Sequence, residues 1–381
     1  MKRRLFALLL ASLFLIQMSN VSNAAVKAGS TCTKLNSTST YGGYKYTCIK
    51  TGKKLVWSKG VKVTTATPTP TATPTPMPAP LTSFQDVLSR YKDIKYWAWK
   101  NAFDAQNSSI ASEPEIVLLA GPNTKNCFIK SEQALKDIFK VYEGSNRPKK
   151  IWVLNADKVD RAWLEAKTSE LLLPNQRQFV NGIDVNPHGV NNLMEAVEWI
   201  EDSCSNTFPV DNSGGGVAHG FTHEIQKLQF LGSNQNWGNV PRWLVEGSAT
   251  FSENFITYGS DYKTWILNPA FHNDEFKKYD LQFYMDYLLL KKLDGNNSLW
   301  AYTDQWPNQR AYDLGSYVCE ILVALKGPAS VMNLFAEFVK TGNYDQSFKN
   351  IYGITWTEAQ PLVSQAIYAE NIWLLDRNSK F

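Results

Sequence analysis

Hydrophobic and polar positions divide the chain into segments of different character, and the first is an unbroken apolar run from Leu5 to Ile16. This run is shorter than the roughly 20 residues that a membrane-spanning helix needs. It follows three basic residues and gives way to small and polar ones, with Ser22 and Ala24 placed as in a signal-peptide cleavage site. We therefore expect residues 1–24 to be a signal peptide. No second long apolar run follows, so we expect no transmembrane segment in the exported chain; an uncleaved membrane anchor is the alternative.

Residues 25–62 are predicted to form a small β module. Tyr44–Lys50 and Lys54–Ser58 are short strand-like runs with a Thr-Gly turn signal between them. A domain of about 40 residues rarely has a sufficient core without a covalent staple, and export permits disulfides. Cys32 and Cys48 are the two cysteines of the module, so we expect them to form a disulfide.

Residues 63–80 contain six prolines among threonines and alanines. Proline fixes φ and lacks an amide donor, which excludes a helix or a central strand. We expect an extended Thr/Pro linker here, which leads from the module to a main domain at 81–381.

The main domain first alternates between the two hydrophobic periods and then becomes helical. Helical spacing occurs at 83–105, 131–142 and 160–171, and strand-like runs occur at 115–120 and 150–154. From Leu193 onward the spacing is almost entirely helical. The pattern predicts an α+β fold in which an α/β subdomain precedes a mostly helical one, an arrangement that commonly places a cleft between the two.

The formal charge of the chain is distributed unevenly, and this bears on the partners of the small module. The chain carries a formal charge of +4, of which the signal contributes +3 and residues 25–62 contribute +8 without an acidic residue, so the remainder carries −7. A basic module outside the cell suggests an anionic cell-wall polymer as its neighbour. The alternative is that its lysines only keep a small module soluble. We expect no nucleic acid among the partners.

Three further cysteines lie in the main domain. Cys127 and Cys204 are in polar, turn-like settings and form a candidate second pair, which the sequence leaves open. Cys319 lies in an apolar helical run, and we expect it to be a buried free thiol.

Two histidines, His219 and His223, stand four residues apart in a segment with helical spacing. On a helix these side chains share one face, about 6 Å apart along the axis, so both imidazoles can reach one ion. Glu246 opens a second amphipathic segment and can supply a carboxylate. Two imidazoles, a carboxylate and an open position are a zinc donor set, so we predict a Zn²⁺ site here. The alternative is a coincidental polar pair; His188 and His272 are expected to be ordinary surface residues.

The neighbouring residues resemble the motifs of gluzincin zinc metallopeptidases, which have His-Glu-x-x-His on one helix and Trp-x-x-Glu-Gly-x-Ala on the next. The second motif matches at Trp243, Glu246, Gly247 and Ala249. The resemblance implies a zincin-like fold, a peptide or protein substrate, and peptide-bond hydrolysis by zinc-activated water.

The sequence departs from the gluzincin pattern at Gly220, where the family has the glutamate that accepts a proton from water. Glu224 lies one turn further on, and because helical side chains lean toward the N-terminus it can take over as base; a solvated carboxylate is the alternative. A register that begins at His223 would put Lys227 in a ligand position, which a protonated lysine cannot fill, so we prefer the first register. Since glutamate favours helices over glycine, Gly220→Glu is expected to fold at least as well as the wild type, provided that the space is open.

Residues 311–327 resemble the gluzincin helix that brings a tyrosine hydroxyl to the cleft, where it can stabilise the oxyanion of a tetrahedral intermediate. Tyr312 is the first candidate for this role and Tyr317 the second. The alternative is a core aromatic ring with its hydroxyl at the surface.

Residues 25–62 also resemble a small Cys-paired module of actinobacterial exported proteins. Together these features predict a secreted protein of the cell envelope in which the module and linker present a zinc metallopeptidase-like domain. A catalytically inactive pseudopeptidase that binds a peptide or a cell-wall polymer is the alternative, because Gly220 removes the usual base. A wall-binding adhesin whose function resides in the module is the third hypothesis.

Overall fold

The computed structural model describes residues 26–63, 77–124, 129–156, 158–173, 177–180, 184–200, 213–269, 279–289 and 307–378. The chain divides into two compact units, Met1–Met77 and Pro78–Phe381, called here the N-terminal and the C-terminal unit. The predicted signal peptide, most of the linker, Cys127, Cys204 and His272 lie outside the described residues, as does the side chain of His188.

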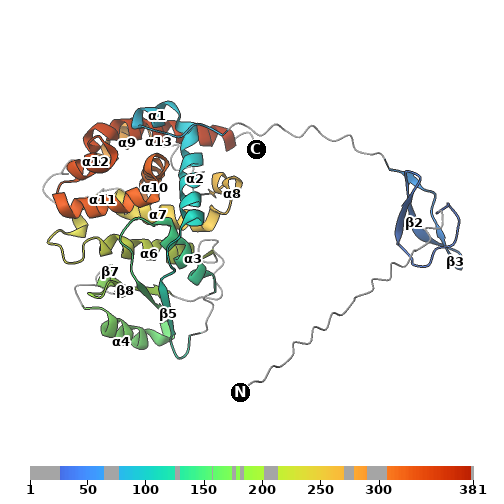
Figure 1. The fold of residues 1–381 in the computed structure, drawn as a ribbon, viewed down its shortest axis with the longest axis horizontal. Coiled ribbons are helices and arrows are strands. Elements are labelled where there is room, and N and C mark those ends of the chain that lie inside the picture. The colour runs from blue at the N-terminus through green and yellow to red at the C-terminus, as the bar shows by residue number, and fades with distance from the viewer. Residues whose placement is uncertain are drawn as a thin grey trace, which may run out of the picture. The chain divides into compact units, whose positions relative to one another are not determined.

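The N-terminal unit is an antiparallel sheet (blue in Figure 1). Its strands are β1 (Thr38–Tyr41), β2 (Tyr44–Thr51), β3 (Lys54–Trp57) and β4 (Val61–Lys62). Strand β2 is central and pairs antiparallel with the other three. Cys32 and Cys48 form the predicted disulfide, and both side chains are buried. The turn between β2 and β3 contains Gly52 at φ +59°, in the left-handed region that glycine adopts readily.

The C-terminal unit contains a five-stranded sheet in the order β5-β6-β9-β8-β7. Its strands are β5 (Glu115–Ala120), β6 (Lys150–Asn155), β7 (Arg177–Val180), β8 (Asp184–Val190) and β9 (Glu195–Ile200). Strands β5, β6 and β9 run parallel, whereas β8 is antiparallel to β9 and to β7. A mixed sheet followed by a mostly helical region confirms the predicted α+β class.

Strand β9 differs from the prediction, which placed almost only helix from Leu193 onward. Apolar residues at Leu193, Ala196, Val197 and Ile200 fit a helical period, and glutamate favours helices. The segment is nevertheless a strand, because β6 pairs with it on one side and β8 on the other. Neighbouring side chains of β9 point to opposite faces of the sheet. Both faces are covered, which buries Ala196 and Val197 alike.

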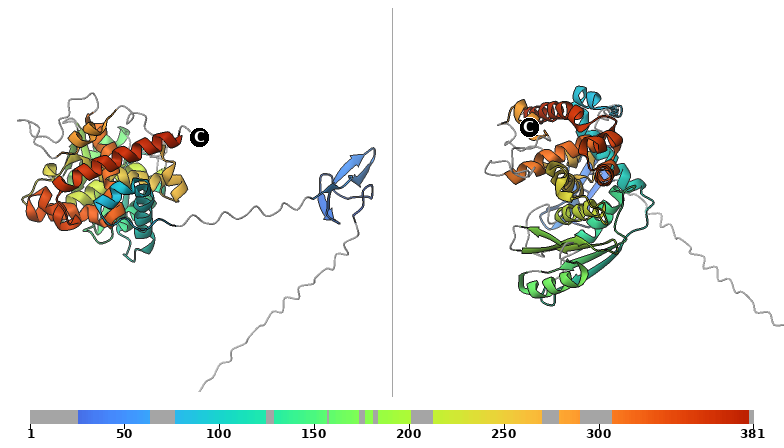
Figure 2. Two further views of the ribbon diagram at one scale, coloured as in Figure 1. Left: turned by 90° about the horizontal axis from the view of Figure 1, so that it is seen from above. Right: turned by 90° about the vertical axis from the view of Figure 1, so that its left-hand side faces the viewer.

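Helices lie on both faces of this sheet (Figures 1 and 2). Helix α4 (Arg161–Leu171) covers one face, where Leu164 packs with Leu154 and Val197. On the other face lie α3 (Ile129–Val141) and α6 (Gly215–Leu228), followed by α7 (Arg242–Tyr258) and α10 (Pro307–Lys326). The remaining helices are α1 (Phe84–Ser89), α2 (Ile94–Ser108), α8 (Tyr262–Ile266), α9 (Leu281–Tyr287), α11 (Pro328–Thr341), α12 (Tyr344–Tyr352) and α13 (Trp356–Asn378), with 3-10 turns at Tyr91–Asp93, Lys158–Asp160 and Trp237–Asn239.

Helix α10 is central to the helical region, since it packs against α7 and α2 and has Leu314, Val318 and Leu322 fully buried. Cys319 on the same helix is a buried free thiol, as predicted. Among the described residues no single helix is long and apolar enough to cross a membrane. Only Ala311–Lys326 and Pro328–Thr341, which are bent by 104° at their junction, meet that criterion as a pair.

Candidate metal centre

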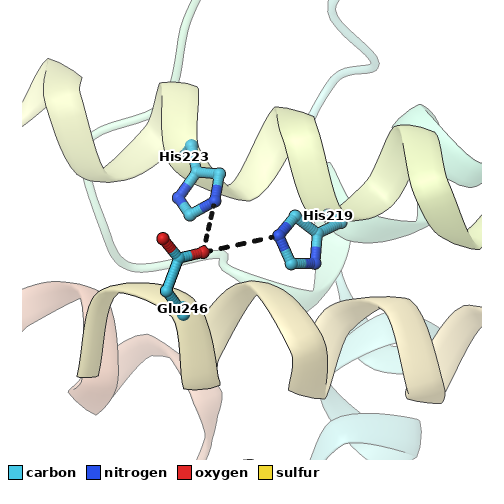
Figure 3. A group of neighbouring side chains, drawn as sticks. All are labelled: His219, His223 and Glu246. Carbon is cyan, nitrogen blue, oxygen red and sulfur yellow. Dashed lines mark ion pairs between the residues drawn. The ribbon is translucent and has the colours of Figure 1, made fainter. Parts of the chain in front are cut away.

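Helix α6 carries both histidines that were predicted as ligands. It begins after Gly214, whose φ of +84° is in the left-handed region that favours glycine. Its apolar residues Phe221 and Ile225 are fully buried in the main core, and the helix lies between the sheet and α7. His219 and His223 point toward α7, which carries Glu246 (Figure 3).

The three predicted ligand residues come together in space. His223 Nε2 lies 3.3 Å and His219 Nε2 lies 3.7 Å from the same oxygen, Glu246 Oε2. One ring nitrogen of each histidine and one carboxylate oxygen of Glu246 all lie within 4.8 Å of one another. The side chains are largely buried, with 17% of His219, 8% of His223 and 5% of Glu246 exposed. This cluster could hold a metal ion.

The Nδ1 atom of each imidazole, on the side of the ring away from Glu246, faces a hydrogen-bond acceptor. His219 Nδ1 is 2.9 Å from Glu253 Oε2, and His223 Nδ1 is 3.1 Å from Gln226 Oε1. The amide nitrogen of Gln226 donates to Val245 O and to Ser248 Oγ, so its oxygen is the atom that faces the ring. In a neutral imidazole, an acceptor at Nδ1 holds the ring proton there and leaves a lone pair on Nε2. Both Nε2 atoms face the shared carboxylate, so each can bind a metal ion once it carries no proton.

The cluster has strongly shifted protonation equilibria. Burial disfavours a proton on His219, but hydrogen bonds to Glu246 and Glu253 outweigh it and raise the pKa of His219 to about 9. Burial lowers the pKa of His223, although the hydrogen bond to Glu246 and the charge of Glu246 act to raise it. Burial alone would raise the pKa of Glu246, yet the two imidazoles hold it well below its usual range. A cation that binds here competes with protons for the same lone pairs, so its affinity would depend on pH.

Two further polar side chains surround Glu246. Arg242 Nη2 lies 3.4 Å from Glu246 Oε1, one helical turn away on α7. The ring of Tyr312 stacks on His219, with centroids 5.5 Å apart and planes 13° apart. Burial and the neighbouring Glu246 raise the pKa of Tyr312 to about 12, although Arg242 acts in the opposite direction. The Tyr312 hydroxyl therefore stays protonated and can donate a hydrogen bond at the edge of the cluster.

Two glycines set the distance between Glu246 and Tyr312. A Cβ on Gly247 would lie 2.1 Å from the backbone carbonyl carbon of Gly315, and a Cβ on Gly315 would lie 2.1 Å from Trp243 O. The backbones of α7 and α10 are thus in direct contact at this point. Only glycine permits this approach, which explains in physical terms why glycine follows the glutamate in the second motif.

The other two candidate catalytic residues lie deeper. Glu224 is fully buried, and Lys227 Nζ donates to its Oε1 at 3.1 Å. Whether Glu224 acts as a base stays a prediction. Tyr317 is buried on α10 with the ammonium group of Lys95 4.2 Å from its ring centroid, so Tyr312 rather than Tyr317 is the tyrosine at the cluster.

The space beside Gly220 is filled rather than open. A Cβ at this position would lie 2.4 Å from Glu198 Oε1 and 3.0 Å from its Cδ. Glu198 is on β9 and is 1% exposed. Burial raises the pKa of its carboxyl well above the usual range, although the positive charges of Lys227 and His219 act against this. The condition for the expected folding of Gly220→Glu is therefore not met, because the new side chain would have to displace the Glu198 carboxylate.

Three polar residues of this region were not predicted from the sequence. Arg242 and Glu253 lie on α7 at one and two turns from Glu246, so the helical spacing of this segment could have identified them. Glu198 could not be found in this way, because its segment was interpreted as helical and its neighbour on α6 is distant in the sequence.

Comparisons of the chain with protein-family models, with curated proteins and with solved structures find no match.

Proposed function

We propose that the C-terminal unit is a zinc-dependent peptidase in which His219, His223 and Glu246 hold the ion. The observation that carries this proposal is the arrangement of ring nitrogens: both Nε2 atoms face one carboxylate oxygen, while Glu253 and Gln226 accept at the two Nδ1 atoms. A coincidental polar pair would not require two oriented rings. The donor set of two imidazoles and one carboxylate fits zinc. The likeness to gluzincin motifs supports a peptide bond as the target.

Zinc bound at these residues supplies a Lewis acid that polarises a carbonyl group and makes water more acidic. The chain itself contributes donors beside the ligand carboxylate. Tyr312, kept protonated, and Arg242, always charged, can donate to the oxygen that becomes negative when a carbonyl is attacked. Glu253 and Gln226 keep the two imidazoles in the orientation that binding requires.

Metal content and hydrolysis measured on the same purified chain test the proposal. The wild type should carry about one zinc per chain and cleave members of a broad peptide library. His223→Ala should lose both properties, whereas Ser330→Ala, which alters a similarly buried polar residue of α11, should keep the metal. A wild-type chain that contains no zinc and takes up none when it is added would rule the proposal out.

A pseudopeptidase is the second candidate, and Gly220 is the observation that favours it, because no carboxylate stands at that position of the helix. Zinc content without hydrolysis, together with saturable binding of a peptide or of a cell-wall polymer, would support this candidate over the first.

For the N-terminal unit we propose export and binding to an anionic polymer of the cell envelope. The eight lysines of residues 25–62 are all exposed, and these residues contain no acidic residue. Replacing Lys45, Lys50, Lys53 and Lys54 by Gln in the full chain should weaken co-sedimentation with isolated cell walls. Added salt should weaken wild-type binding in the same way, because it screens exposed charges. Equal binding by the wild type and the variant would contradict this proposal.

A further inference from the structure

Glu198 and Gly220 are complementary in shape. The two carboxylate oxygens of Glu198 lie 2.4 and 3.0 Å from the position that a Cβ of residue 220 would take. Real Cβ atoms do not approach other atoms so closely, so Glu198 can keep this position only if residue 220 is glycine. Glycine is a poor residue for the interior of a helix, and Gly220 lies in the middle of α6. The carboxylate gives a physical reason for it.

The strand pairing of β9 brings Glu198 to this place. Alternate residues of a strand point to the same face, so Glu198 shares its face with Ala196, which belongs to the same core cluster as Phe221 and Ile225 of α6. The Glu198 carboxylate lies against Gly220, which is next to His219 in the chain. Gly220 is partly exposed and directly follows this ligand residue. A carboxylate is thus present beside the first ligand, although α6 does not provide it.

We propose that Glu198 is the general base of this site and replaces, from strand β9, the carboxylate that the gluzincin pattern places at residue 220 of the helix. The inference rests on the proposed peptidase function. Gly220 then indicates a transfer of the carboxylate to another element rather than a loss of catalysis.

The proton balance of this role is simple. In its ionised form, Glu198 accepts a proton from the attacking water as the water oxygen bonds to the carbonyl carbon. It then delivers that proton to the amide nitrogen as the C–N bond breaks. The products are a carboxylic acid and an amine, and Glu198 returns to its ionised form.

Glu198 and Glu224 differ in their position relative to the first ligand, His219. One oxygen of Glu224 is held by Lys227 on the same helix, one turn beyond the histidines. The Glu198 carboxylate lies against the backbone position adjacent to His219. The two carboxylates therefore lie at different points along α6, one beside Gly220 and the other a turn further on. Separate variants of Glu198 and Glu224 show which of them acts as the base.

The steric part of the inference is tested without any measurement of activity. Gly220→Ala should fail to raise the melting temperature in the wild-type background, because the methyl group displaces the Glu198 carboxylate. In a Glu198→Ala background the same change should raise it, since alanine favours the helix. If Glu198→Ala does not fold, Glu198→Ser, which keeps a polar group but vacates the space, replaces it as the background and should give the same gain. Equal effects of Gly220→Ala in the wild-type and Glu198→Ala chains would show that Glu198 does not fill this space.

The catalytic part is tested on the zinc-containing full chain. Glu198→Gln should retain zinc but lower kcat by about 10²–10⁴-fold, with a smaller change in KM, and Glu224→Gln should cause a smaller loss. Glu195→Gln on the same strand, whose side chain binds Trp152 and Asn191, is the matched control and should keep wild-type activity. The double variant Gly220→Glu/Glu198→Ala should recover activity, because it returns the carboxylate to the helix.

The outcomes separate this inference from the function on which it rests. Wild-type activity in Glu198→Gln, or a zinc-containing wild type that is inert while Gly220→Glu/Glu198→Ala is active, would refute Glu198 as base and leave the peptidase scaffold in place. A chain without zinc, or with all variants inert, would refute the proposed function and the base together. Even then the melting temperatures decide whether the carboxylate fills the space.

Discussion

At the scale of single residues, the candidate centre depends on how each imidazole is oriented as much as on the ligands themselves. His219 and His223 are each held at Nδ1 by a side-chain oxygen, and in both rings Nε2 faces Glu246. These outer contacts fix the orientation of each ring, which the i,i+4 spacing of the histidines does not. A variant of an outer residue therefore separates orientation from ligation.

Glu253→Gln tests the orientation of His219. The change removes a charged acceptor 2.9 Å from Nδ1 and leaves every proposed ligand in place. We expect zinc affinity to fall by about 10–100-fold, measured by competition with a chelator of known affinity. Glu337→Gln, a glutamate of α11 that pairs with Lys340, serves as control and should not alter the affinity. Unchanged affinity in Glu253→Gln would contradict the assigned role.

At the scale of secondary-structure elements, the contact between α7 and α10 positions Glu246 relative to Tyr312. The two helices touch through the backbones of Gly247 and Gly315, which leaves no room for a methyl group. Strand β9 has a similar positioning role for Glu198, since its pairing with β6 and β8 directs that side chain toward α6.

Gly315→Ala tests the contact between α7 and α10. Its Cβ would lie 2.1 Å from Trp243 O, a backbone atom that cannot rotate away. We expect the free energy of unfolding to fall by about 1–3 kcal/mol or more, as in other overpacked cores. Chemical denaturation measures this change. Gly216→Ala, at an exposed position of α6, should instead be neutral or slightly stabilising, since alanine favours helices. A Gly315→Ala protein as stable as the wild type would show that the helices can separate without cost.

At the scale of the whole molecule, each unit has its own source of stability. The N-terminal unit has few residues and one disulfide. The C-terminal unit has a large core that encloses a charged cluster, in which Lys95 on α2 contacts Glu320 on α10 and lies 3.9 Å from Glu370 on α13. This cluster links three helices that are far apart in the sequence.

Reduction of the Cys32–Cys48 disulfide should unfold the N-terminal unit and leave the C-terminal unit intact. A disulfide of a small domain contributes about 2–5 kcal/mol, which is comparable to the whole stability of such a domain. Hydrogen exchange followed by mass spectrometry reports both units in one sample. Loss of protection confined to 26–63 is the expected result, and protection that persists there after reduction would contradict it.

Glu370 should make the C-terminal unit less stable as pH rises. One lysine neutralises one carboxylate, and Lys95 contacts Glu320 directly, so burial and the charge of Glu320 raise the pKa of Glu370 to about 8 despite Lys95. The folded pKa is above the ordinary value of 4.5, so this contribution is fully present below about pH 4.5 and is lost as pH rises through 8. The loss is at most about 1.4 kcal/mol per pH unit for one proton.

Chemical denaturation at pH 5 and pH 8 measures this effect. Glu370→Gln removes the titration, so its stability relative to the wild type should increase from pH 5 to pH 8. Glu358→Gln, an exposed position at the start of the same helix, is the control. A difference between Glu370→Gln and the wild type that is independent of pH would show that Glu370 is ionised throughout this range.

Features that depend on short separations along the chain could be predicted from the sequence alone. The positions of His219 and His223 on one helix face follow from a spacing of four residues, and the disulfide follows from a small module with two cysteines. The α+β class follows from periods read within windows of a few residues. Such features need no knowledge of which distant segments meet.

The side chains that surround these residues, in contrast, depend on how distant segments pack. The segment of β9 has a helical period and becomes a strand because two other strands pair with it. That choice of partners turns Glu198 toward Gly220, twenty-two residues further along the chain, and fills a space that the sequence suggested was open. Lys95 likewise meets Glu320 and Glu370 only after α2, α10 and α13 have packed. Contacts of this kind depend on the free energy of burying whole faces of helices and sheets, which no local pattern contains.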